Sequence, residues 1–187
     1  RLRALYVIGE NPKLSDPDWN HLDRAVRKLD LVVVQELFLS ETSQVADVVF
    51  PAASVAEKEG TFTNTERRCM RVRKAIEPIG NSLADWEILV RLSNAMGYPM
   101  AYDSPEDIFR EITSLTRSYA GMSYERLGLD GLMWPCPEPD HPGTPYLHKE
   151  RFLRPGGKAK FHAVSYLDPA EMPDEEYPYL LTTGRMF

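Results

Sequence analysis

The sequence predicts an α/β fold in which a parallel sheet is flanked by helices. Three short apolar runs, at residues 4–8, 30–35 and 47–50, have the continuous hydrophobic composition of strands buried on both faces of a parallel sheet. Helical patterns at residues 17–28 and 41–46 lie between them. Strands that alternate with helices form βαβ units, so we expect the three strands to lie parallel in one sheet.

Each of these elements has a local signal. The run at residues 4–8 ends at Gly-Glu-Asn-Pro, residues 9–12, a composition typical of a turn. A helix over residues 17–28 can be capped by Ser15 or Asp16, and its apolar side chains recur on one face. The sequence therefore predicts where each strand stops and where the first helix starts.

After the third strand the alternation of strands and helices gives way to a mixed pattern. Residues 61–63 and 69–76 can form a small hairpin. Residues 85–96 carry apolar side chains at helical spacing, and a capping box predicts a helix over residues 105–115. A third short helix is expected after Ser123.

The C-terminal part of the chain is rich in proline and acidic residues. Residues 135–145 hold five prolines and are expected to form an extended linker. Residues 160–164 can form a strand, residues 169–178 form an acidic linker, and a new strand begins over residues 179–182. These features place a domain boundary near residues 170–178.

Composition limits the class of protein. The 187 residues carry a net charge of −6, which argues against binding of nucleic acid through overall charge. The two cysteines, Cys69 and Cys136, have no metal-ligand spacing, so a reducing compartment, the cytoplasm, is expected. No stretch approaches the ~20 apolar residues of a membrane span. Both ends of the chain look cut, which predicts a piece of a longer protein.

The turn after the first strand is the first candidate binding element. Gly9 has no side chain to block the approach of a ligand, and Asn11 offers donors and an acceptor to a phosphate or a sugar. A helix that begins just downstream would add positive dipole for an anion. The alternative is an ordinary β-turn, which uses the same residue types.

The end of the second strand is the second candidate. In dinucleotide-binding folds an acidic residue at this position accepts hydrogen bonds from ribose hydroxyls, and Glu36 stands there with Gln35 beside it. The alternative is a solvated carboxylate at a strand end.

The third candidate is the segment that starts at Asp47 and includes a polar loop at residues 57–68. The arginines of this loop, Arg67 and Arg68, could contact phosphate or a partner. A solvated loop, with Asp47 capping the preceding turn, is the alternative. No His or Cys stands in a spacing that predicts a metal site or a catalytic dyad, so no catalytic residue is assigned.

Several sequence blocks, taken in order, have the pattern of one family. The blocks are Tyr-Val-Ile-Gly-Glu-Asn-Pro at residues 6–12, Gln-Glu-Leu-Phe-Leu-Ser-Glu-Thr at 35–42, Ala-Asp-Val-Val-Phe-Pro at 46–51, Glu-Lys-Glu-Gly-Thr-Phe-Thr-Asn-Thr-Glu-Arg-Arg at 57–68 and Asp-Trp-Glu-Ile at 85–88. Together they resemble the molybdopterin oxidoreductases, and within that family the catalytic subunits of formate dehydrogenase.

The resemblance implies a fold, a cofactor and partners. Residues 1–170 would be most of a Rossmann-like domain that binds molybdopterin guanine dinucleotide, and residues 178–187 would be the first strand of a β-rich C-terminal cofactor-binding domain. In the intact enzyme, formate would be oxidised at molybdenum or tungsten. Electrons would then leave through an iron–sulfur cluster, held outside this chain, towards electron-transfer subunits.

The resemblance also implies the cofactor contacts. Gly9, Glu10 and Asn11 match the first dinucleotide loop, and Gln35 and Glu36 match the residues that contact the ribose and the guanine. Ser40 and Thr42 match the loop after the second strand, and Asp47 falls near the guanine end of the site. Thr183, Gly184 and Arg185 match a loop from the C-terminal domain.

The chain departs from the family pattern in what it lacks. The cysteines that bind the iron–sulfur cluster and the residue that ligates the metal are absent, so we expect the chain alone to catalyse nothing. Two alternatives are the large iron–sulfur subunit of respiratory complex I and a stand-alone nucleotide-binding module. Gln35 and Glu36 favour the enzyme over the complex I subunit.

Overall fold

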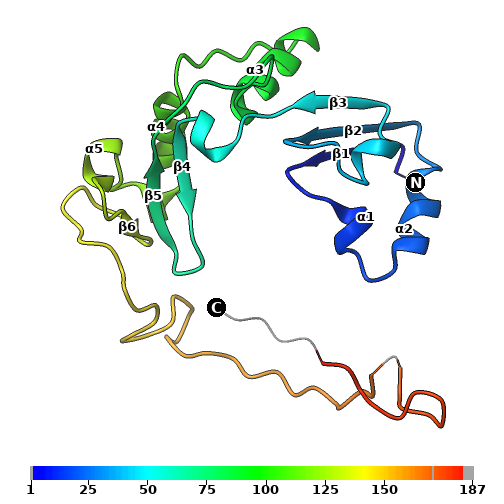
Figure 1. Ribbon diagram of the computed structural model, residues 1–187. Coiled ribbons are helices and arrows are strands. Elements are labelled where there is room, and N and C mark those ends of the chain that lie inside the picture. The colour runs from blue at the N-terminus through cyan, green and yellow to red at the C-terminus, as the bar shows by residue number, and fades with distance from the viewer. Residues whose placement is uncertain (1, 170, 183–187) are drawn as a thin grey trace. The chain divides into compact units, whose positions relative to one another are not determined.

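The computed structural model describes residues 2–169 and 171–182. The chain divides into two compact units, one that runs to Pro145 and one that begins at Tyr146. All the helices and strands found among the described residues belong to the first unit (Figure 1).

The first sheet is parallel and three-stranded, as predicted. Its strands are β1 (Ala4–Ile8), β2 (Leu31–Glu36) and β3 (Val48–Pro51), and β2 lies in the middle. In the register, Val7 lies opposite Val34. The α/β fold class is therefore confirmed, and the carboxyl ends of the three strands lie along one edge.

One face of this sheet is packed against α2 (Trp19–Val26). The helix begins later than predicted because Asp18, rather than Ser15 or Asp16, is its N-cap and accepts a hydrogen bond from the backbone N–H of His21 at 2.9 Å. A short helix, α1 (Pro12–Ser15), precedes it. The helix expected over residues 41–46 is a 3₁₀ turn, η1 (Ser43–Val45). The buried residues of this core are Val7, Val26, Val32 and Val34.

The second half of this unit is built around a small antiparallel sheet. Its strands are β4 (Gly60–Thr63), β5 (Arg68–Val72) and β6 (Leu132–Met133), and β5 is the central one. The first two form the predicted hairpin, whereas β6 was not expected. Three helices accompany the sheet: α3 (Asp85–Ala95), α4 (Pro105–Leu115) and α5 (Tyr124–Leu127). Two 3₁₀ turns complete the unit: η2 (Val55–Glu57) and η3 (Arg117–Tyr119).

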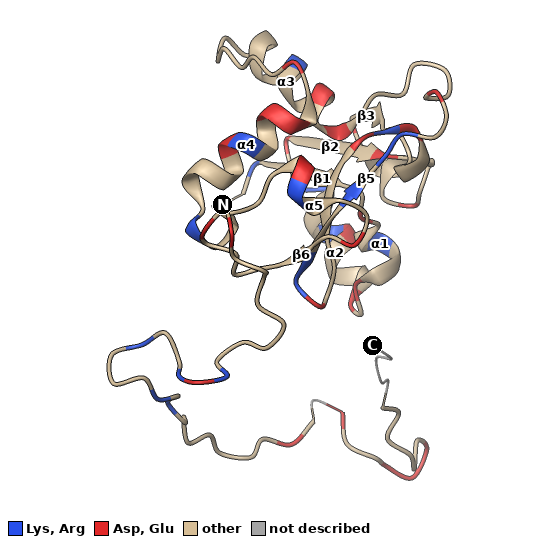
Figure 2. Cartoon of the chain, turned by 90° about the vertical axis from the view of Figure 1, so that its left-hand side faces the viewer, with Lys and Arg blue, Asp and Glu red and all other residues tan. Residues whose placement is uncertain are grey.

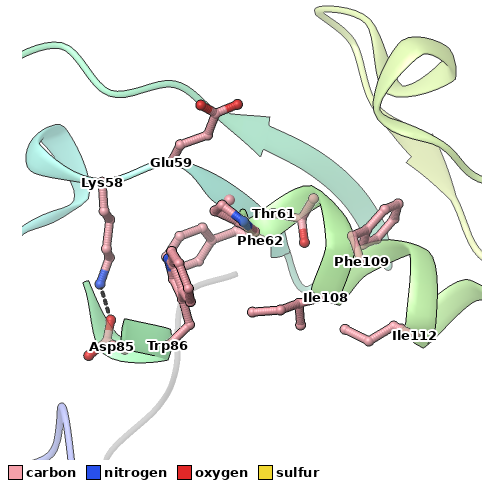
Figure 3. Close-up of a pocket in the computed structure, with 11 residues that line it drawn as sticks. Lys58, Glu59, Thr61, Phe62, Asp85, Trp86, Ile108, Phe109 and Ile112 are labelled. Atoms are coloured by element: carbon pink, nitrogen blue, oxygen red, sulfur yellow. Dashed lines mark hydrogen bonds and ion pairs between the residues drawn. The ribbon is translucent and has the colours of Figure 1, made fainter. Parts of the chain in front are cut away.

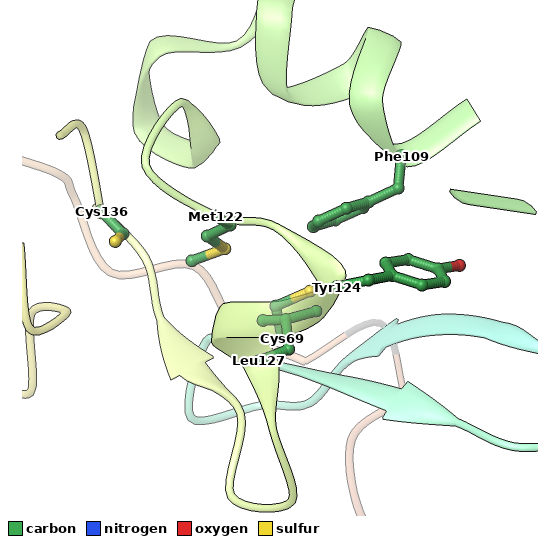
Figure 4. Packing of buried hydrophobic residues seen from close by; sticks show 6 residues of the cluster. All are labelled: Cys69, Phe109, Met122, Tyr124, Leu127 and Cys136. Atoms are coloured by element: carbon green, nitrogen blue, oxygen red, sulfur yellow. The ribbon is translucent and has the colours of Figure 1, made fainter. Parts of the chain in front are cut away.

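A second hydrophobic core joins these elements. It contains both cysteines, and burial raises the pKa of the Cys69 thiol. Figure 4 shows how its side chains gather from β5, α4, α5 and the segment after β6. The buried members are Cys69, Phe109, Met122, Tyr124, Leu127 and Cys136.

Residues 135–145 are part of this unit, so the prediction of a linker was wrong. Two arginines hold the segment by its carbonyl oxygens. Arg126 donates to the carbonyl of His141 at 2.7 Å, and Arg67 donates to those of Thr144 and Pro145 at 3.1 and 3.0 Å. Prolines exclude regular structure here, and the guanidinium groups satisfy the carbonyls instead. The first unit therefore ends at Pro145, before the boundary expected near residues 170–178.

Residues 146–182 form no helix or strand where the structure describes them. The strands predicted at residues 160–164 and 179–182 are absent there, because a strand needs a hydrogen-bonded partner and none of the described residues supplies one. Charge is segregated along this segment: residues 149–160 are mainly basic and residues 168–176 mainly acidic (Figure 2). No helix in the described part of the chain is long and apolar enough to span a membrane. The assignment of residues 178–187 to a second domain stays a prediction.

Candidate functional site

A cavity of about 390 Å³ lies at the carboxyl edge of the parallel sheet. The loops that leave the three strands form part of its wall. The backbone N–H of Gly9 donates to the carbonyl of Gln35 at 2.9 Å, and that of Ala52 donates to the carbonyl of Glu36 at 3.0 Å. The polar residues that line the cavity are Gln35, Glu36, Ser54, Lys58 and Asp85.

Gly9 has the backbone conformation that the turn requires. Its φ is +62°, in the left-handed region that favours glycine. A Cβ built there would meet no atom within 4 Å, so the space beside the turn is open. The backbone N–H of Gly9 already donates to the carbonyl of Gln35, so it is not free to bind a ligand. What the turn offers a ligand is space.

A chain of polar side chains connects the sheet to α3. The Tyr6 hydroxyl donates to Gln35 Oε1 at 2.6 Å, and Gln35 Nε2 donates to Asp85 Oδ1 at 2.7 Å. Lys58 Nζ forms an ion pair with the other carboxylate oxygen, Asp85 Oδ2 (Figure 3). Burial, with the charge of Asp85, raises the pKa of Tyr6. We call this series, Tyr6, Gln35, Asp85 and Lys58, the polar relay.

Gln35 and Glu36 differ in what they offer a ligand. The Gln35 side chain is 0% exposed, and its amide oxygen and nitrogen are both used within the polar relay. In this structure the side chain therefore positions its neighbours, and its expected direct contact with the cofactor stays a prediction. Glu36 is half-buried on the cavity wall, where its Oε1 accepts from the backbone N–H of Leu37 at 2.7 Å. Glu36 is thus the last residue of β2, the strand end at which the sequence predicted it.

Asn11, Ser40 and Thr42 stabilise the loops behind the cavity. The Asn11 side chain donates to Glu41 at 2.6 Å and accepts from the Thr42 hydroxyl at 2.7 Å. The hydrogen bond from Asn11 is the first cause of a lowered pKa at Glu41. The Ser40 hydroxyl lies 3.0 Å from that of Ser43. These contacts join the loop after β1 to the loop after β2.

Two of the expected anion-binding features differ from our prediction. The helix after the first turn, α1, has only four residues, so little dipole is added there. Arg67 and Arg68 both form hydrogen bonds within the protein. Arg67 donates to the carbonyl of Pro145 in the segment after β6. Arg68 donates to the Glu66 carboxylate at 3.5 Å and to the carbonyl of Asp130 at 3.2 Å.

Asp47 lies at the opposite edge of the sheet. Its carboxylate accepts from the backbone N–H of Val32 at 2.7 Å, at the start of β2, and it is therefore separated from the cavity by the length of the strands. The bond is to the neighbouring strand β2 and not to the preceding turn, which was the alternative for Asp47; its expected contact at the guanine end of the cofactor site stays a prediction. Glu10 is exposed in the first turn. Thr183, Gly184 and Arg185 lie outside the described residues.

Sequence reasoning missed Tyr6, Lys58 and Asp85 as members of the site. Asp85 is 50 positions from Gln35, and no local pattern indicates their contact. A second cavity, of about 260 Å³, has Lys58 and Asp85 in its wall too and is otherwise mainly apolar (Figure 3). Lys58 and Asp85 thus line both the cavity at the sheet edge and this mainly apolar cavity. Within the described residues, no group of His, Cys, Asp and Glu could hold a metal ion.

The fold and the cavity define a class of protein. A parallel sheet with a polar cavity at the carboxyl ends of its strands is the arrangement of nucleotide-binding α/β domains. The model of the family described as "Molybdopterin oxidoreductase" matches residues 1–95. The chain belongs to the molybdopterin oxidoreductase family.

Known relatives are similar over the whole chain. The chain is 51% identical to F420-dependent formate dehydrogenase 2 subunit alpha of Methanococcus maripaludis and 50% identical to F420-dependent formate dehydrogenase subunit alpha of Methanocaldococcus jannaschii. These alignments cover 100% and 99% of this chain but 28% of each relative. It is also 45% identical to the probable oxidoreductase YjgC of Bacillus subtilis, covering 100% of this chain and 19% of that protein. These relatives do not favour the complex I alternative.

A solved structure shares the fold. Acetylene hydratase from Pelobacter acetylenicus superposes with a TM-score of 0.54 at 20% identity, over 66% of this chain and 17% of that chain. Identity at this level supports the fold alone.

We predict that Gln35→Leu destabilises the protein more than an exposed substitution of the same kind. The change removes the hydrogen-bond partner of the Tyr6 hydroxyl and one of the two partners of the Asp85 carboxylate, which keeps its ion pair with Lys58. A polar group left unsatisfied in this way costs about 1–3 kcal/mol. Urea unfolding measures the difference, and Gln44→Leu, at an exposed position, is the matched control. Equal stability of the two variants would contradict a structural role for the relay.

Glu57 predicts a dependence of stability on pH. The hydrogen bond from the backbone N–H of Ser54 is the first cause of its lowered pKa, and the backbone N–H of Ile79 donates to it at 2.9 Å. A carboxyl group with a lowered pKa in the folded state stabilises the protein above its unfolded pKa. That contribution is lost as the pH falls through the folded value.

We therefore expect Glu57→Gln to be less stable than the parent protein near neutral pH and to lose less stability on acidification. Thermal unfolding between neutral pH and about pH 3 measures this, because the interval spans the ordinary pKa of a carboxyl group. Glu150→Gln, at an exposed position, is the control. Parallel pH profiles for the parent and Glu57→Gln would contradict the prediction.

Proposed function

We propose that the chain binds the nucleotide portion of a molybdopterin guanine dinucleotide as part of the catalytic subunit of a formate dehydrogenase. The observation that carries the proposal is the cavity at the carboxyl edge of the parallel sheet, with Glu36 on its wall. Its support is the 50–51% identity to formate dehydrogenase alpha subunits over the whole chain. Because the chain spans only 28% of those relatives, the activity belongs to a longer polypeptide.

The residues of the cavity fit a nucleoside. Its volume, about 390 Å³, is within the range of small-molecule sites. The Glu36 carboxylate can accept hydrogen bonds from two ribose hydroxyls. Lys58 offers a donor, and Ser54 offers a donor and an acceptor, to a guanine ring that carries N–H donors and a carbonyl oxygen.

The charges of the cavity favour the base and the ribose over the phosphates. Two carboxylates, Glu36 and Asp85, face one ammonium group, Lys58, which is already paired. A diphosphate would be repelled by this balance. We infer that it extends past the open turn at Gly9, and that its counter-charges come from elsewhere in the polypeptide.

The bound group would supply the redox chemistry, through molybdenum or tungsten, that converts formate to carbon dioxide. This chain's residues would hold the group in place: the polar relay fixes the wall, and Glu36 fixes the ribose. We further propose that an iron–sulfur cluster, bound outside this chain, passes electrons to partner subunits. The cytoplasm is the proposed location, because Cys69 and Cys136 are both free thiols.

Calorimetric titration with GDP and ADP tests the nucleotide site. We expect GDP to bind more tightly than ADP, and Glu36→Ala to weaken GDP binding by about tenfold or more, since a hydrogen bond to a charged group contributes about 1.5–3 kcal/mol. Glu125→Ala, at an exposed position of α5 outside the cavity and outside the predicted cofactor contacts, is the control. Equal or tighter binding of ADP would contradict a guanine site and favour a general nucleotide-binding module.

Formate-dependent reduction of a viologen dye tests the enzyme. We expect activity from the longer subunit that contains this chain, loaded with cofactor, and none from the 187 residues alone. Dye reduction by the isolated chain would contradict the assignment of the metal-ligating residues to another part of the polypeptide. An inactive, fully loaded subunit would contradict formate as the substrate.

A further inference from the structure

Positive charge gathers in one short segment of the second unit. Residues 149–160 hold five cationic side chains and one acidic one, Glu150, although the whole chain carries a net charge of −6. All five cations are exposed (Figure 2). They are Lys149, Arg151, Arg154, Lys158 and Lys160. We call residues 149–160 the basic turn.

A β-turn fixes the shape of this segment. The backbone N–H of Gly157 donates to the carbonyl of Arg154 at 2.8 Å, with Pro155 and Gly156 between them. Gly156 has a φ of +82°, and a type II turn requires a positive value at that position. The backbone N–H of Phe152 donates to the carbonyl of Gly157 at 3.0 Å and closes the loop. Local structure therefore sets where the cations lie.

Three of the cations leave this closed loop. Arg154 opens the β-turn and Lys158 follows it. The side chain of Arg151 packs beside Gly157, where an added Cβ would lie 3.5 Å from Arg151 Cβ. Like charges on one short loop repel one another, so the arrangement costs free energy unless carboxylates offset it. Leu153, which is 80% exposed, stands among these cations in the sequence.

The described part of the second unit does not supply those carboxylates. None of the five cations forms an ion pair with a described residue of that unit. Five acidic residues follow in the same unit: Asp168, Glu171, Asp174, Glu175 and Glu176. Asp174 is engaged locally, because it accepts from the backbone N–H groups of Glu176 and Tyr177 at 2.9 and 2.6 Å. The charge of the basic turn is therefore open to a partner.

The charge pattern favours a protein partner with an acidic patch. Nucleic acid and an anionic membrane are uniformly negative. They would repel a chain whose net charge is −6 and whose acidic segment follows closely after the basic turn. A protein surface can instead place carboxylates opposite the basic turn alone, with an apolar side chain beside Leu153.

We propose that the basic turn docks an acidic patch on a separate electron-transfer subunit. Segments of one polypeptide are already tethered, so they need no electrostatic steering. Separate subunits must find each other, and complementary charges speed their encounter and fix their orientation. The inference rests on the proposed function in one respect, that the longer subunit passes electrons to partner subunits.

Zero-length cross-linking of the purified holoenzyme tests the contact directly. A carbodiimide joins a lysine amine to a carboxylate that it touches, and Lys149, Lys158 and Lys160 supply the amines. We expect mass spectrometry to find at least one of them joined to an Asp or Glu of another subunit. Lys74, which forms an ion pair with Glu77, is the control and is expected to be joined within the chain. Cross-links from the basic turn to its own polypeptide alone, or none from it, would overturn the proposal.

Charge reversal tests the contribution of the cations. Arg151→Glu with Arg154→Glu is expected to raise the apparent Kd between the longer subunit and its partner about tenfold or more at low salt, and the difference should shrink as salt screens the charges. Arg24→Glu with Arg117→Glu, at exposed positions of the first unit, changes the net charge equally and is expected to have little effect. An equal loss of affinity in this control pair would contradict a local contact.

The conservative pair separates charge from structure. Arg151→Lys with Arg154→Lys keeps both charges, so we expect nearly the parental Kd. A loss as large as that of the glutamate pair would contradict docking by charge.

Other partners give other outcomes. The longer subunit is mixed with phosphatidylserine vesicles and with single-stranded DNA. Binding to either that Arg151→Glu with Arg154→Glu abolishes would assign the basic turn to that partner and overturn the proposal. An active subunit that purifies without any other polypeptide would overturn it as well.

Cross-linking and affinity do not depend on catalysis. Subunits that dock through the basic turn but do not oxidise formate support the docking surface and contradict the proposed enzyme. A holoenzyme that oxidises formate but yields no cross-link from the basic turn to another subunit does the reverse.

Discussion

The buried amide of Gln35 joins the two halves of the first compact unit. A primary amide that is removed from water must find partners for its oxygen and its nitrogen, and here the partners come from β1 and from the first turn of α3. The second of these fixes Asp85, and Asp85 in turn fixes Lys58 through an ion pair. Two halves of the unit with separate hydrophobic cores are thus joined by a directional polar contact.

The same demand for satisfied polar groups explains the proline-rich segment. Residues 135–145 cannot form a regular ladder, yet Cys136 is fully buried and the neighbouring carbonyl groups need donors. Arg67 and Arg126 provide them, since one planar guanidinium group can donate to several carbonyls. Long-range hydrogen bonds from side chains therefore satisfy the backbone carbonyls of this segment, as hydrogen bonds between strands do elsewhere in the unit.

The cavity at the carboxyl edge of the parallel sheet has several hydrogen-bonding side chains but little net positive charge. Under the proposed function, this balance fits a site that other parts of the polypeptide complete. A binding site shared in this way would gain its phosphate contacts and its shielding from water only when the parts assemble.

Local sequence determined the elements whose signals are local. The strand at residues 4–8 and the helix at residues 105–115 form as predicted, because hydrophobic runs, caps and prolines act over a few residues. The place of Glu36 at a strand end followed from the same pattern. Tertiary contacts decided three other features: the burial of Gln35, the position of Asp47 at the opposite edge of the sheet, and the packing of residues 135–145 against the first unit. Such contacts join residues far apart in the chain, and residue type alone does not reveal which partner a polar group will find.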